Sequence, residues 1–441
     1  MATYLTRTNG SAVTAERKLF TISFWVKRCA TGVQHALCSA GNGGGSEEFS
    51  IRFQASDQLD VFHYTGSFQG RLITNRLFRD TNSWYHIYFL SDTANGTAGD
   101  RMQLYINGVR ETSFATNSNA AQNDLLPWNV DERHQIGSNS WGNSGNGSST
   151  LNGIISHFYN VAGSNIAVTQ FGSVDNVTGE WQINTSPTIA SYGTNGFLVL
   201  KDGNTITDQS PNSNNFTVGG GTLTKSEDCP SNIFCTGNPL YSHNVSNQNN
   251  VPYTNGNTTW GASSATNNHS WGRSTLGWTS GKYYMEFKIT EVSGGQSSGV
   301  WMVPTEYGNF SPQAVSNTAY GWQVQFSGSD DNFYTVNGGS TVATVTNNVG
   351  SNPIIMMAID ADNKKMWVGH NGTWYNNNNA STTLNNSYPD HTWTIGTYGD
   401  MYQLAFQAYY QSGAYNSNQA NFGNGYFGTT AVSSAGTNAS N

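Results

Sequence analysis

The chain has 441 residues, of which 10% are charged, 13% are aromatic and 49 are glycine, and its formal net charge is −8. Its 19 Lys and Arg residues are scattered, which excludes the clustered basic face of a nucleic-acid-binding protein. No apolar run approaches the ~20 residues of a membrane-spanning helix, and the aromatic content is that of a folded chain rather than a disordered one.

The first 180 residues alternate apolar and polar side chains, as half-buried strands do. Ile22, Phe24 and Val26 share one face of an expected strand. Trp84–Leu90 is apolar on both faces, which is typical of a central strand packed on two sides. The dipeptide Asn107-Gly108 predicts a tight hairpin turn, because both residue types tolerate positive φ. We therefore predict an antiparallel β-sandwich over residues 1–180.

The character of the chain changes over residues 181–255. A single strand pattern, Phe197–Leu200, is flanked by stretches rich in Asn, Ser, Pro and Gly. Too few apolar residues remain here for an independent core. We predict a connector that contributes one or two strands to its neighbours.

Alternation resumes over residues 256–428. Tyr283, Met285 and Phe287 lie on one expected strand face, and Ile354–Ile359 is an apolar run short enough for a buried strand. Strand patterns recur roughly every ten residues with turn signals between them, as in antiparallel sandwiches. The sequence thus predicts an all-β chain of two antiparallel sandwiches, followed by a polar tail at 429–441.

The cysteines form two short-range pairs, Cys29 with Cys38 and Cys229 with Cys235. Neither pair has the Cys-x-x-Cys spacing of a metal or redox site, and the first nine residues lack the pattern of a secretory signal. We expect synthesis in a cytoplasm, with the thiols reduced and lying in the core or in loops.

The first region resembles laminin G and concanavalin A-like domains. The resemblance rests on four motifs in the expected order: residues 20–27 (FTISFWVK), 82–87 (NSWYHI), 104–109 (LYINGV) and 151–155 (LNGII). It implies a jelly-roll-like sandwich. Members of these families include both glycosidases and lectins, so the resemblance alone leaves hydrolysis and binding open.

The third region resembles SPRY (B30.2) domains at residues 280–287 (SGKYYMEF), 359–374 and 419–423 (QANFG). The connector motifs, which include residues 208–216 (DQSPNSNNF) and 228–240, are similar to those of virion proteins of marine bacteriophages. In those proteins a laminin-G-like unit precedes a SPRY-like unit. They continue beyond residue 430 into another apolar segment, so we expect the tail of this chain to be shortened relative to them.

The sequence contains little that would support an enzyme that hydrolyses its ligand. Glycosidases on this fold need two carboxylates facing one cleft, whereas Glu47 and Glu48 should point to opposite faces of a strand. Asp360 and Asp362 lie at an expected hairpin turn, where Asp commonly serves the backbone. There is no Gly-x-Ser-x-Gly motif and no His-x-x-x-His spacing. We therefore expect a protein that is not an enzyme and has no cofactor.

Calcium is the one metal for which the sequence contains candidate ligands. Asp131-Glu132, or the run Ser329-Asp330-Asp331-Asn332, could supply hard oxygen ligands. Neither segment matches a calcium motif, and acidic turn residues are usually only solvated. No metal site is assigned.

Four aromatic residues in expected loops are the candidate ligand-binding residues: Trp141, Trp271, Trp374 and Tyr375. Sugars stack on flat aromatic faces flanked by amide groups, and each of these residues has Asn or Gly nearby. The alternative is that such residues cap the end of a sandwich or bury a subunit contact.

The resemblance implies a protein of the virion surface, in the tail or the head, made in the host bacterial cytoplasm. Its expected role is a tail-fibre or receptor-binding component that recognises a host-surface polysaccharide. The alternative is a head decoration protein that binds only neighbouring virion subunits, and a polysaccharide depolymerase is a third reading. The expected partners are other virion proteins and copies of the chain in a homo-oligomer, with no nucleic acid and no membrane insertion.

Overall fold

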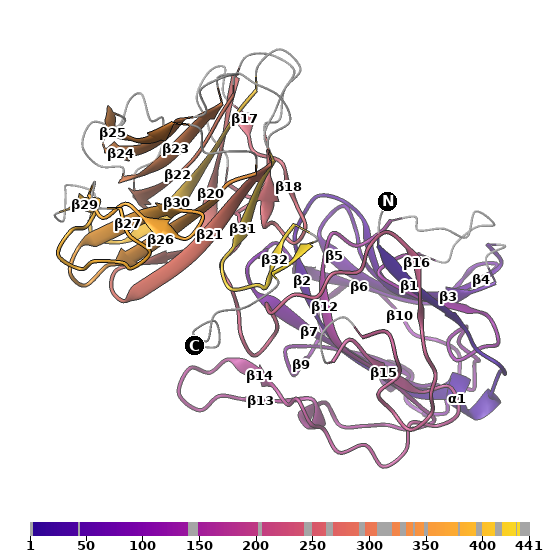
Figure 1. Cartoon of the computed structure of the whole chain (residues 1–441). Helices are drawn as coiled ribbons and strands as arrows, with labels where there is room; N and C mark the ends of the chain where they lie inside the picture. Colours follow the sequence, from indigo (N-terminus) through magenta and orange to yellow (C-terminus); the bar gives the residue numbers. More distant parts are fainter. Residues whose placement is uncertain are drawn as a thin grey trace. The chain divides into compact units, whose positions relative to one another are not determined.

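The structure is a computed structural model. It describes residues 3–42, 45–139, 149–201, 205–241, 249–261, 268–290, 296–306, 320–326, 332–337, 340–347, 352–377, 380–393, 399–410, 417–428 and 430–432. The chain divides into two compact units, residues 1–233 and residues 234–441 (Figure 1). Each is all-β, as the sequence predicts. The one described α-helix is the short α1, Thr14–Lys18, and no described helix has the length and apolar character to cross a membrane.

The first unit consists mainly of two antiparallel sheets. The eight-stranded sheet contains, in spatial order, β10 (Phe114–Ser118), β6 (Phe68–Leu77), β5 (Gln58–Thr65), β4 (Glu47–Phe53), β3 (His35–Gly41), β11 (Arg133–Ile136), β1 (Tyr4–Thr8) and β16 (Thr217–Gly220). The six-stranded sheet contains β15 (Phe197–Val199), β12 (Gly153–Ala162), β2 (Leu19–Arg28), β7 (Trp84–Asp92), β8 (Met102–Ile106) and β9 (Val109–Arg110). Two short 3₁₀ turns, Ala98–Asp100 and Val168–Gln170, lie in the connections.

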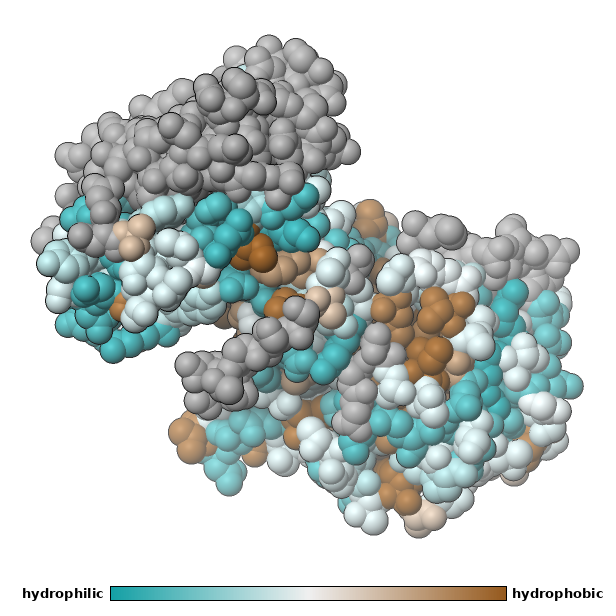
Figure 2. Space-filling view, in the orientation of Figure 1, coloured by the Kyte–Doolittle hydropathy of each residue, from teal (hydrophilic) through white to brown (hydrophobic). Residues whose placement is uncertain are grey.

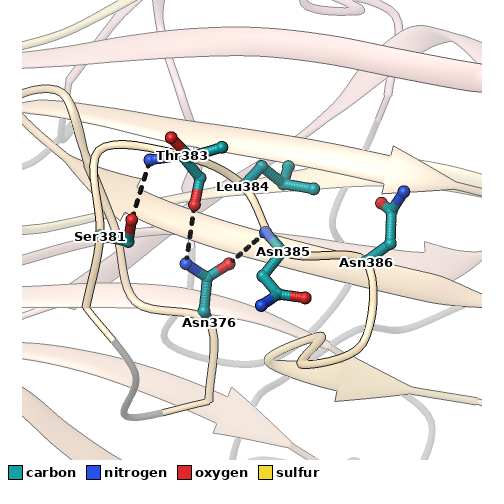
Figure 3. Close-up of a pocket in the computed structure, with 6 residues that line it drawn as sticks. All are labelled: Asn376, Ser381, Thr383, Leu384, Asn385 and Asn386. Atoms are coloured by element: carbon teal, nitrogen blue, oxygen red, sulfur yellow. Dashed lines mark hydrogen bonds between the residues drawn. The ribbon is translucent and has the colours of Figure 1, made fainter.

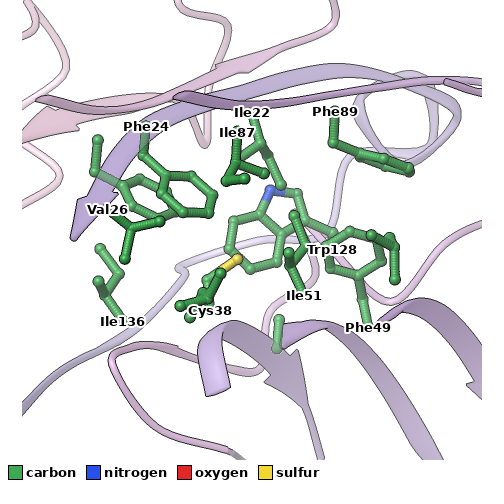
Figure 4. Packing of buried hydrophobic residues seen from close by; sticks show 14 of the residues in the cluster. Ile22, Phe24, Val26, Cys38, Phe49, Ile51, Ile87, Phe89, Trp128 and Ile136 are labelled. Carbon is green, nitrogen blue, oxygen red and sulfur yellow. The ribbon is translucent and has the colours of Figure 1, made fainter. Parts of the chain in front are cut away.

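The core of the first unit lies between these sheets (Figure 4). Ile22, Phe24 and Val26 of β2 point into it and are fully buried, which confirms the predicted face. Phe49 and Ile51 of β4 meet them from the other sheet. The core is therefore built from alternate residues of both sheets, as in other β-sandwiches.

A second apolar cluster covers the other face of β7. Tyr88 and Leu90 pack there against Phe171 and Leu198, while Phe89 points into the main core. The strand is thus buried on both faces, as its apolar run predicts. Asn107 and Gly108 have φ of 49° and 75°, which confirms the tight turn between β8 and β9.

The segment expected to be a connector is divided between the units. Residues 181–233 lie in the first unit and residues 234–255 in the second. β15 and β16 are edge strands of the first unit's two sheets, and β13 (Gly172–Val174) pairs with β14 (Trp181–Ile183) as a separate hairpin.

The second unit also has two antiparallel sheets. One contains β17 (Asn249–Asn250), β20 (Asn268–Trp278), β30 (Tyr402–Tyr410), β22 (Gln296–Pro304), β23 (Tyr320–Phe326), β24 (Asn332–Asn337) and β25 (Ser340–Asn347), with β17 joined in parallel. The other contains β18 (Tyr253–Thr254), β19 (Thr259–Trp260), β31 (Ser417–Asn421), β21 (Lys282–Thr290), β26 (Ile354–Asp360), β27 (Lys365–His370) and β28 (Thr373–Trp374), with β29 (His391–Thr392) also paired to β27. A small hairpin is formed by β32 (Tyr426–Phe427) and β33 (Thr430–Ala431).

The core of the second unit confirms the predicted alternation in β21. Met285, Phe287 and Ile289 are buried between the sheets, next to Ile355 and Met357 of β26. Tyr283, predicted on the same face, lies at the start of the strand and is 41% exposed. The intervening residues of β21 therefore point away from the core. This outward face carries the candidate site.

Candidate functional site

Strands β21, β26, β27 and β28 place a row of side chains on the outward face of their sheet. Glu286 of β21 lies opposite Met356 of β26. Met356 in turn lies opposite Gly369 of β27, and Gly369 lies opposite Trp374 of β28. Tyr284 lies two residues before Glu286 on β21 and therefore on the same face of the sheet.

Gly369 lets two apolar groups close over the sheet. A Cβ on this residue would lie 2.5 Å from Met356 Cε and 3.2 Å from Trp374 Cε3. The rings of Trp374 and Tyr284 lie with their centroids 6.1 Å apart and their planes at 59°. Tyr284 is 53% exposed, Trp374 is half-buried and Met356 is buried. We call Tyr284, Met356, Gly369 and Trp374 the aromatic platform.

A carboxylate lies at the edge of the platform. The hydroxyl of Tyr284 donates a hydrogen bond of 2.5 Å to Glu286 Oε1. Burial and this contact with a carboxylate raise the pKa of Tyr284, so the phenol stays protonated. The platform therefore presents aromatic carbon together with one hydrogen-bond acceptor.

A polar cavity of about 250 Å³ lies next to the platform (Figure 3). Ser381, one of its lining residues, exchanges two backbone hydrogen bonds of 2.7 and 2.8 Å with Trp374, which ties the cavity to the platform. Its lining carries amide, hydroxyl and aliphatic groups and no charge: Asn376, Ser381, Thr383, Leu384, Asn385 and Asn386. We call these residues the amide pocket.

The pocket is shaped by a buried asparagine. Asn376 and Asn377 have φ of 47° and 50°, a left-handed conformation that Asn adopts more readily than most residues. The Asn376 amide donates to the Thr383 carbonyl at 3.1 Å and accepts from the Asn385 N–H at 2.8 Å, as Figure 3 shows. Two backbone positions of the loop are thus held by one side chain.

Asp390 anchors the same loop to the sheet. Its two carboxylate oxygens accept from the N–H groups of Val368 and Asn377, each at 2.9 Å. Burial raises the pKa of Asp390 to about 6 in spite of these hydrogen bonds. The carboxylate is a structural anchor, because both of its oxygens are spent on the backbone.

Exposed amides remain for a ligand. The side chains of Asn385 and Asn386 are exposed, and Asn385 Oδ1 accepts from the Ser387 N–H. Among the described residues, the Asn386 amide and Asn385 Nδ2 make no hydrogen bond. Each amide N–H₂ supplies two donors and each carbonyl oxygen accepts. This is the complement of a hydroxylated, uncharged ligand.

The four sequence-predicted aromatic residues lie in different places. Trp374 is part of the aromatic platform, whereas its neighbour Tyr375 is buried in the core of the second unit. Trp271 lies in strand β20 and is 1% exposed, packed against Trp301, so its expected loop position was wrong. Trp141 lies outside the described residues.

Sequence reasoning missed most of the site. Tyr284 and Glu286 were recognisable as the outward face of β21, since they alternate with its buried residues. The pocket asparagines were visible only as an Asn-rich loop. The pairing of Trp374 with Ser381 and the close approach at Gly369 depend on register, which the sequence does not give.

The described residues contain no group of three or more His, Cys, Asp or Glu side chains close enough to hold a metal ion. Asp131 is exposed and Glu132 half-buried in the connection before β11. In the second calcium candidate, Ser329, Asp330 and Asp331 lie outside the described residues. No calcium site is assigned at either segment.

Residues 2–162 match a family model described as the concanavalin A-like lectin/glucanases superfamily. No curated protein matches the chain in sequence. Among solved structures, a putative carbohydrate binding protein from Bacteroides ovatus is similar, with 16% identity, a TM-score of 0.31, and coverage of 52% of this chain and 59% of that one.

Two further solved structures have the folds that the sequence motifs resemble. The SPRY domain of human HERC1 has 16% identity and a TM-score of 0.28, covering 38% of this chain and 91% of that one. Domains LG4-5 of the mouse laminin alpha1 chain have 9% identity and a TM-score of 0.30, covering 99% of this chain and 92% of that one. The family match places a laminin G or concanavalin A-like lectin fold in the first unit, and SPRY domains are among the structural neighbours of the chain.

Proposed function

We propose that this protein binds a glycan through the aromatic platform and the amide pocket. The observation that carries the proposal is the pair of solvent-accessible rings, Tyr284 and Trp374, 6.1 Å apart and directly beside an uncharged cavity rich in amides. A sugar ring offers apolar C–H faces to the aromatic rings and hydroxyl groups to the amides. The match of residues 2–162, in the first unit, to the concanavalin A-like lectin/glucanases superfamily supports glycan binding as a general class of activity for the chain.

The composition of the site favours binding over turnover. Among the residues that the structure describes, Glu286 is the carboxylate at the platform, and Asp390 has both oxygens bound to backbone N–H groups. Glycoside hydrolysis would require two free carboxyl groups flanking the bond to be cleaved. The proposed activity is therefore recognition without catalysis.

The proposed setting is the surface of a bacteriophage particle, where the protein recognises a host-surface polysaccharide as a tail-fibre or receptor-binding component. This setting rests on the resemblance of the connector motifs and of the domain order to marine phage virion proteins. Many copies on one particle would make weak individual sites effective through avidity. Partners would then include other virion proteins as well as the host glycan.

Binding of the purified chain to an array of bacterial surface polysaccharides tests the proposal. Trp374→Ala and Tyr284→Ala should each weaken binding about tenfold or more, since truncating a central aromatic residue costs over ~1 kcal/mol. Leu276→Ala, which removes another exposed apolar side chain of this unit, should leave binding unchanged.

Equal binding by the wild type and both platform variants would overturn the assignment of the site. Release of reducing ends from a bound polysaccharide would contradict recognition without catalysis. Labelling of intact particles separates the settings, because a receptor-binding component should appear at the tail and a decoration protein over the head.

A further inference from the structure

A second polar cluster lies on the outward face of the first unit's eight-stranded sheet. Asp60 of β5 is fully buried there and forms ion pairs with two arginines from the neighbouring strands, Arg52 of β4 and Arg71 of β6. Arg52 Nη2 and Arg71 Nη2 both lie 2.9 Å from Asp60 Oδ2. The two Nε atoms also donate to this carboxylate, each at 3.0 Å. One carboxylate thus serves two guanidinium groups.

Aromatic rings hold both guanidinium groups in place. The Arg71 guanidinium carbon lies 4.3 Å from the centroid of the Phe68 ring, and that of Arg52 lies 4.6 Å from the centroid of the Phe62 ring. Phe62 and Phe68 pack edge to face with centroids 5.5 Å apart. Stacking on the aromatic rings and the shared carboxylate therefore fix the orientation of each planar guanidinium group.

Both arginines keep unused donors. A guanidinium group has five N–H donors. Arg71 donates its Nε–H and one Nη2–H to Asp60, and Arg52 donates its Nε–H and has its Nη2 2.9 Å from the same carboxylate. No other protein acceptor for Arg52 or Arg71 occurs in the part of the chain that the structure describes. Their side chains are 17% and 22% exposed, and neither arginine has a nitrogen that is both buried and without a hydrogen-bond partner, so the remaining donors are accessible to solvent.

The charge of the cluster is also unbalanced. Two arginines face one aspartate, and the other nearby carboxyl group is Glu48 of β4, which is 1% exposed. Burial raises the pKa of Glu48 to about 8, so at neutral pH it is largely protonated and adds no compensating charge. An acidic protein thus carries a local positive site beside an aromatic ring that is 49% exposed, that of Phe68.

We propose that this face binds an acidic saccharide, whose carboxylate or sulfate group accepts hydrogen bonds from Arg52 and Arg71 while its sugar ring packs against Phe68. The paired N–H donors of a planar guanidinium group match the spacing of the oxygens in a carboxylate or sulfate group. A nucleic acid would require many more cations than the two present here. The site lies in the first unit and takes a charged ligand, so it goes beyond the proposed function and does not depend on the platform.

Isothermal titration of the full chain with polygalacturonate, dextran sulfate and neutral dextran tests the proposal and separates carboxylate from sulfate. The wild type should bind at least one polyanion and not dextran. Arg71→Gln and Phe68→Ala should each weaken that binding about tenfold or more. Arg71→Lys should fall between, because an ammonium group keeps the charge and loses the bidentate fork.

Arg110→Gln is the matched control, since Arg110 is an exposed, ion-paired arginine on the other sheet of the same unit. It removes the same charge and should leave binding unchanged. If Arg110→Gln weakens binding as much as Arg71→Gln, or if dextran binds as well as the polyanions, the proposal is overturned. Arg71→Gln retains the Arg52 and Gln54 contacts of Asp60, and a retained cooperative unfolding transition will show that the variant is folded.

Discussion

Glu48 shows how much a single residue departs from the expectation for its type. It lies on the outward face of β4, yet both carboxyl oxygens are buried, and neither has a hydrogen-bond partner in the described structure. Its neighbour Glu47 is exposed, which confirms the predicted opposition of the two side chains. An unpaired buried charge is costly, so Glu48 avoids it by staying protonated, with its pKa raised to about 8.

This raised pKa predicts that the free energy of unfolding of the first unit depends on pH. The folded first unit holds the Glu48 proton more tightly than the unfolded chain, so stability is full below about pH 4.5 and falls as pH rises towards 8. Glu48→Gln cannot ionise and should remove this slope. Between pH 5 and 8 the free energy of unfolding of the wild type should fall relative to the variant by on the order of 3 kcal/mol.

Urea titrations of both proteins at several pH values measure the difference. The comparison uses the slope with pH rather than the absolute stability, because a buried amide has its own desolvation cost. Curves that stay parallel from pH 5 to pH 8 would show that Glu48 is ionised in the folded protein.

The candidate site shows which residues sequence alone can place. Trp374 was found because it follows a hairpin turn beside an Asn-rich loop. Trp271, flanked by Ser270 and Gly272, looks equally like a loop residue, yet it lies in β20 and is buried. Its backbone accepts from Val251, more than fifteen residues earlier. The local sequence pattern around Trp271 therefore does not show that residues distant in the sequence pair with its strand and bury its side chain.

At the scale of elements, the β13–β14 hairpin depends on one tryptophan. The Trp181 ring stacks on His86 of β7, with centroids 5.9 Å apart, and its Nε1–H donates to His86 Nδ1 at 3.0 Å. A Cβ on Gly108 or Gly172 would come within 2.6 Å of this ring, so both glycines make room for it. Figure 2 shows apolar residues at the hairpin tip, where Val177 is 93% exposed.

Trp181→Ala should therefore release the hairpin from the six-stranded sheet. We expect a loss of about 2 kcal/mol in the stability of the first unit, less than for a fully buried tryptophan because Trp181 is half-buried. Limited proteolysis should cut the variant between residues 172 and 183 faster than the wild type.

Val177→Ala is the control, since it shortens an exposed side chain of the same hairpin and should change neither property. Trp181→Phe keeps a ring and loses only the N–H donor, so it should fall between. A Trp181→Ala variant as resistant to proteolysis as the wild type would contradict this account of the hairpin.

Elements were predictable where one sheet face is buried. β2 and β21 have the faces that their alternation predicts, because a shift by one residue would move the apolar side chains of each strand out of the core between the sheets. The strand pattern at Phe197–Leu200 is confirmed as β15, whereas β16 gave little signal, since it adds to the edge of a sheet formed mainly by distant residues. The division of the connector between the two units was not visible for the same reason.

At the scale of the whole molecule, the two units have separate cores and different buried ionisable groups. In the first unit, burial lowers the pKa of four histidines, three to about 4 and one to about 3: His35, His63, His134 and His86. His134 Nε2 accepts from the Asn129 N–H at 3.1 Å, which requires an unprotonated ring nitrogen. In the second unit, burial raises the pKa of Asp390 to about 6.

These shifts have opposite consequences on acidification. A histidine with a lowered pKa contributes stability that is full above its unfolded value near 6.5 and is lost as pH falls towards 4. Asp390, with its pKa raised, contributes stability that is lost as pH rises from about 4 through 6, so acid restores it. In the first unit, Glu48 also regains stability in acid, but the four buried histidines act in the opposite direction and outnumber it. Lowering the pH from 7 to 5 should therefore weaken the first unit and not the second.

Scanning calorimetry of the full chain should show two unfolding transitions, and the one belonging to the first unit should move to lower temperature between pH 7 and pH 5. Matched core variants assign the transitions, because Ile51→Val and Ile355→Val each remove one buried methylene from a different unit and should cost about 1 kcal/mol. Each should shift one transition only. If both transitions fall equally in acid, the histidines of the first unit do not control its stability. If either variant shifts both transitions, the two cores unfold as one cooperative unit.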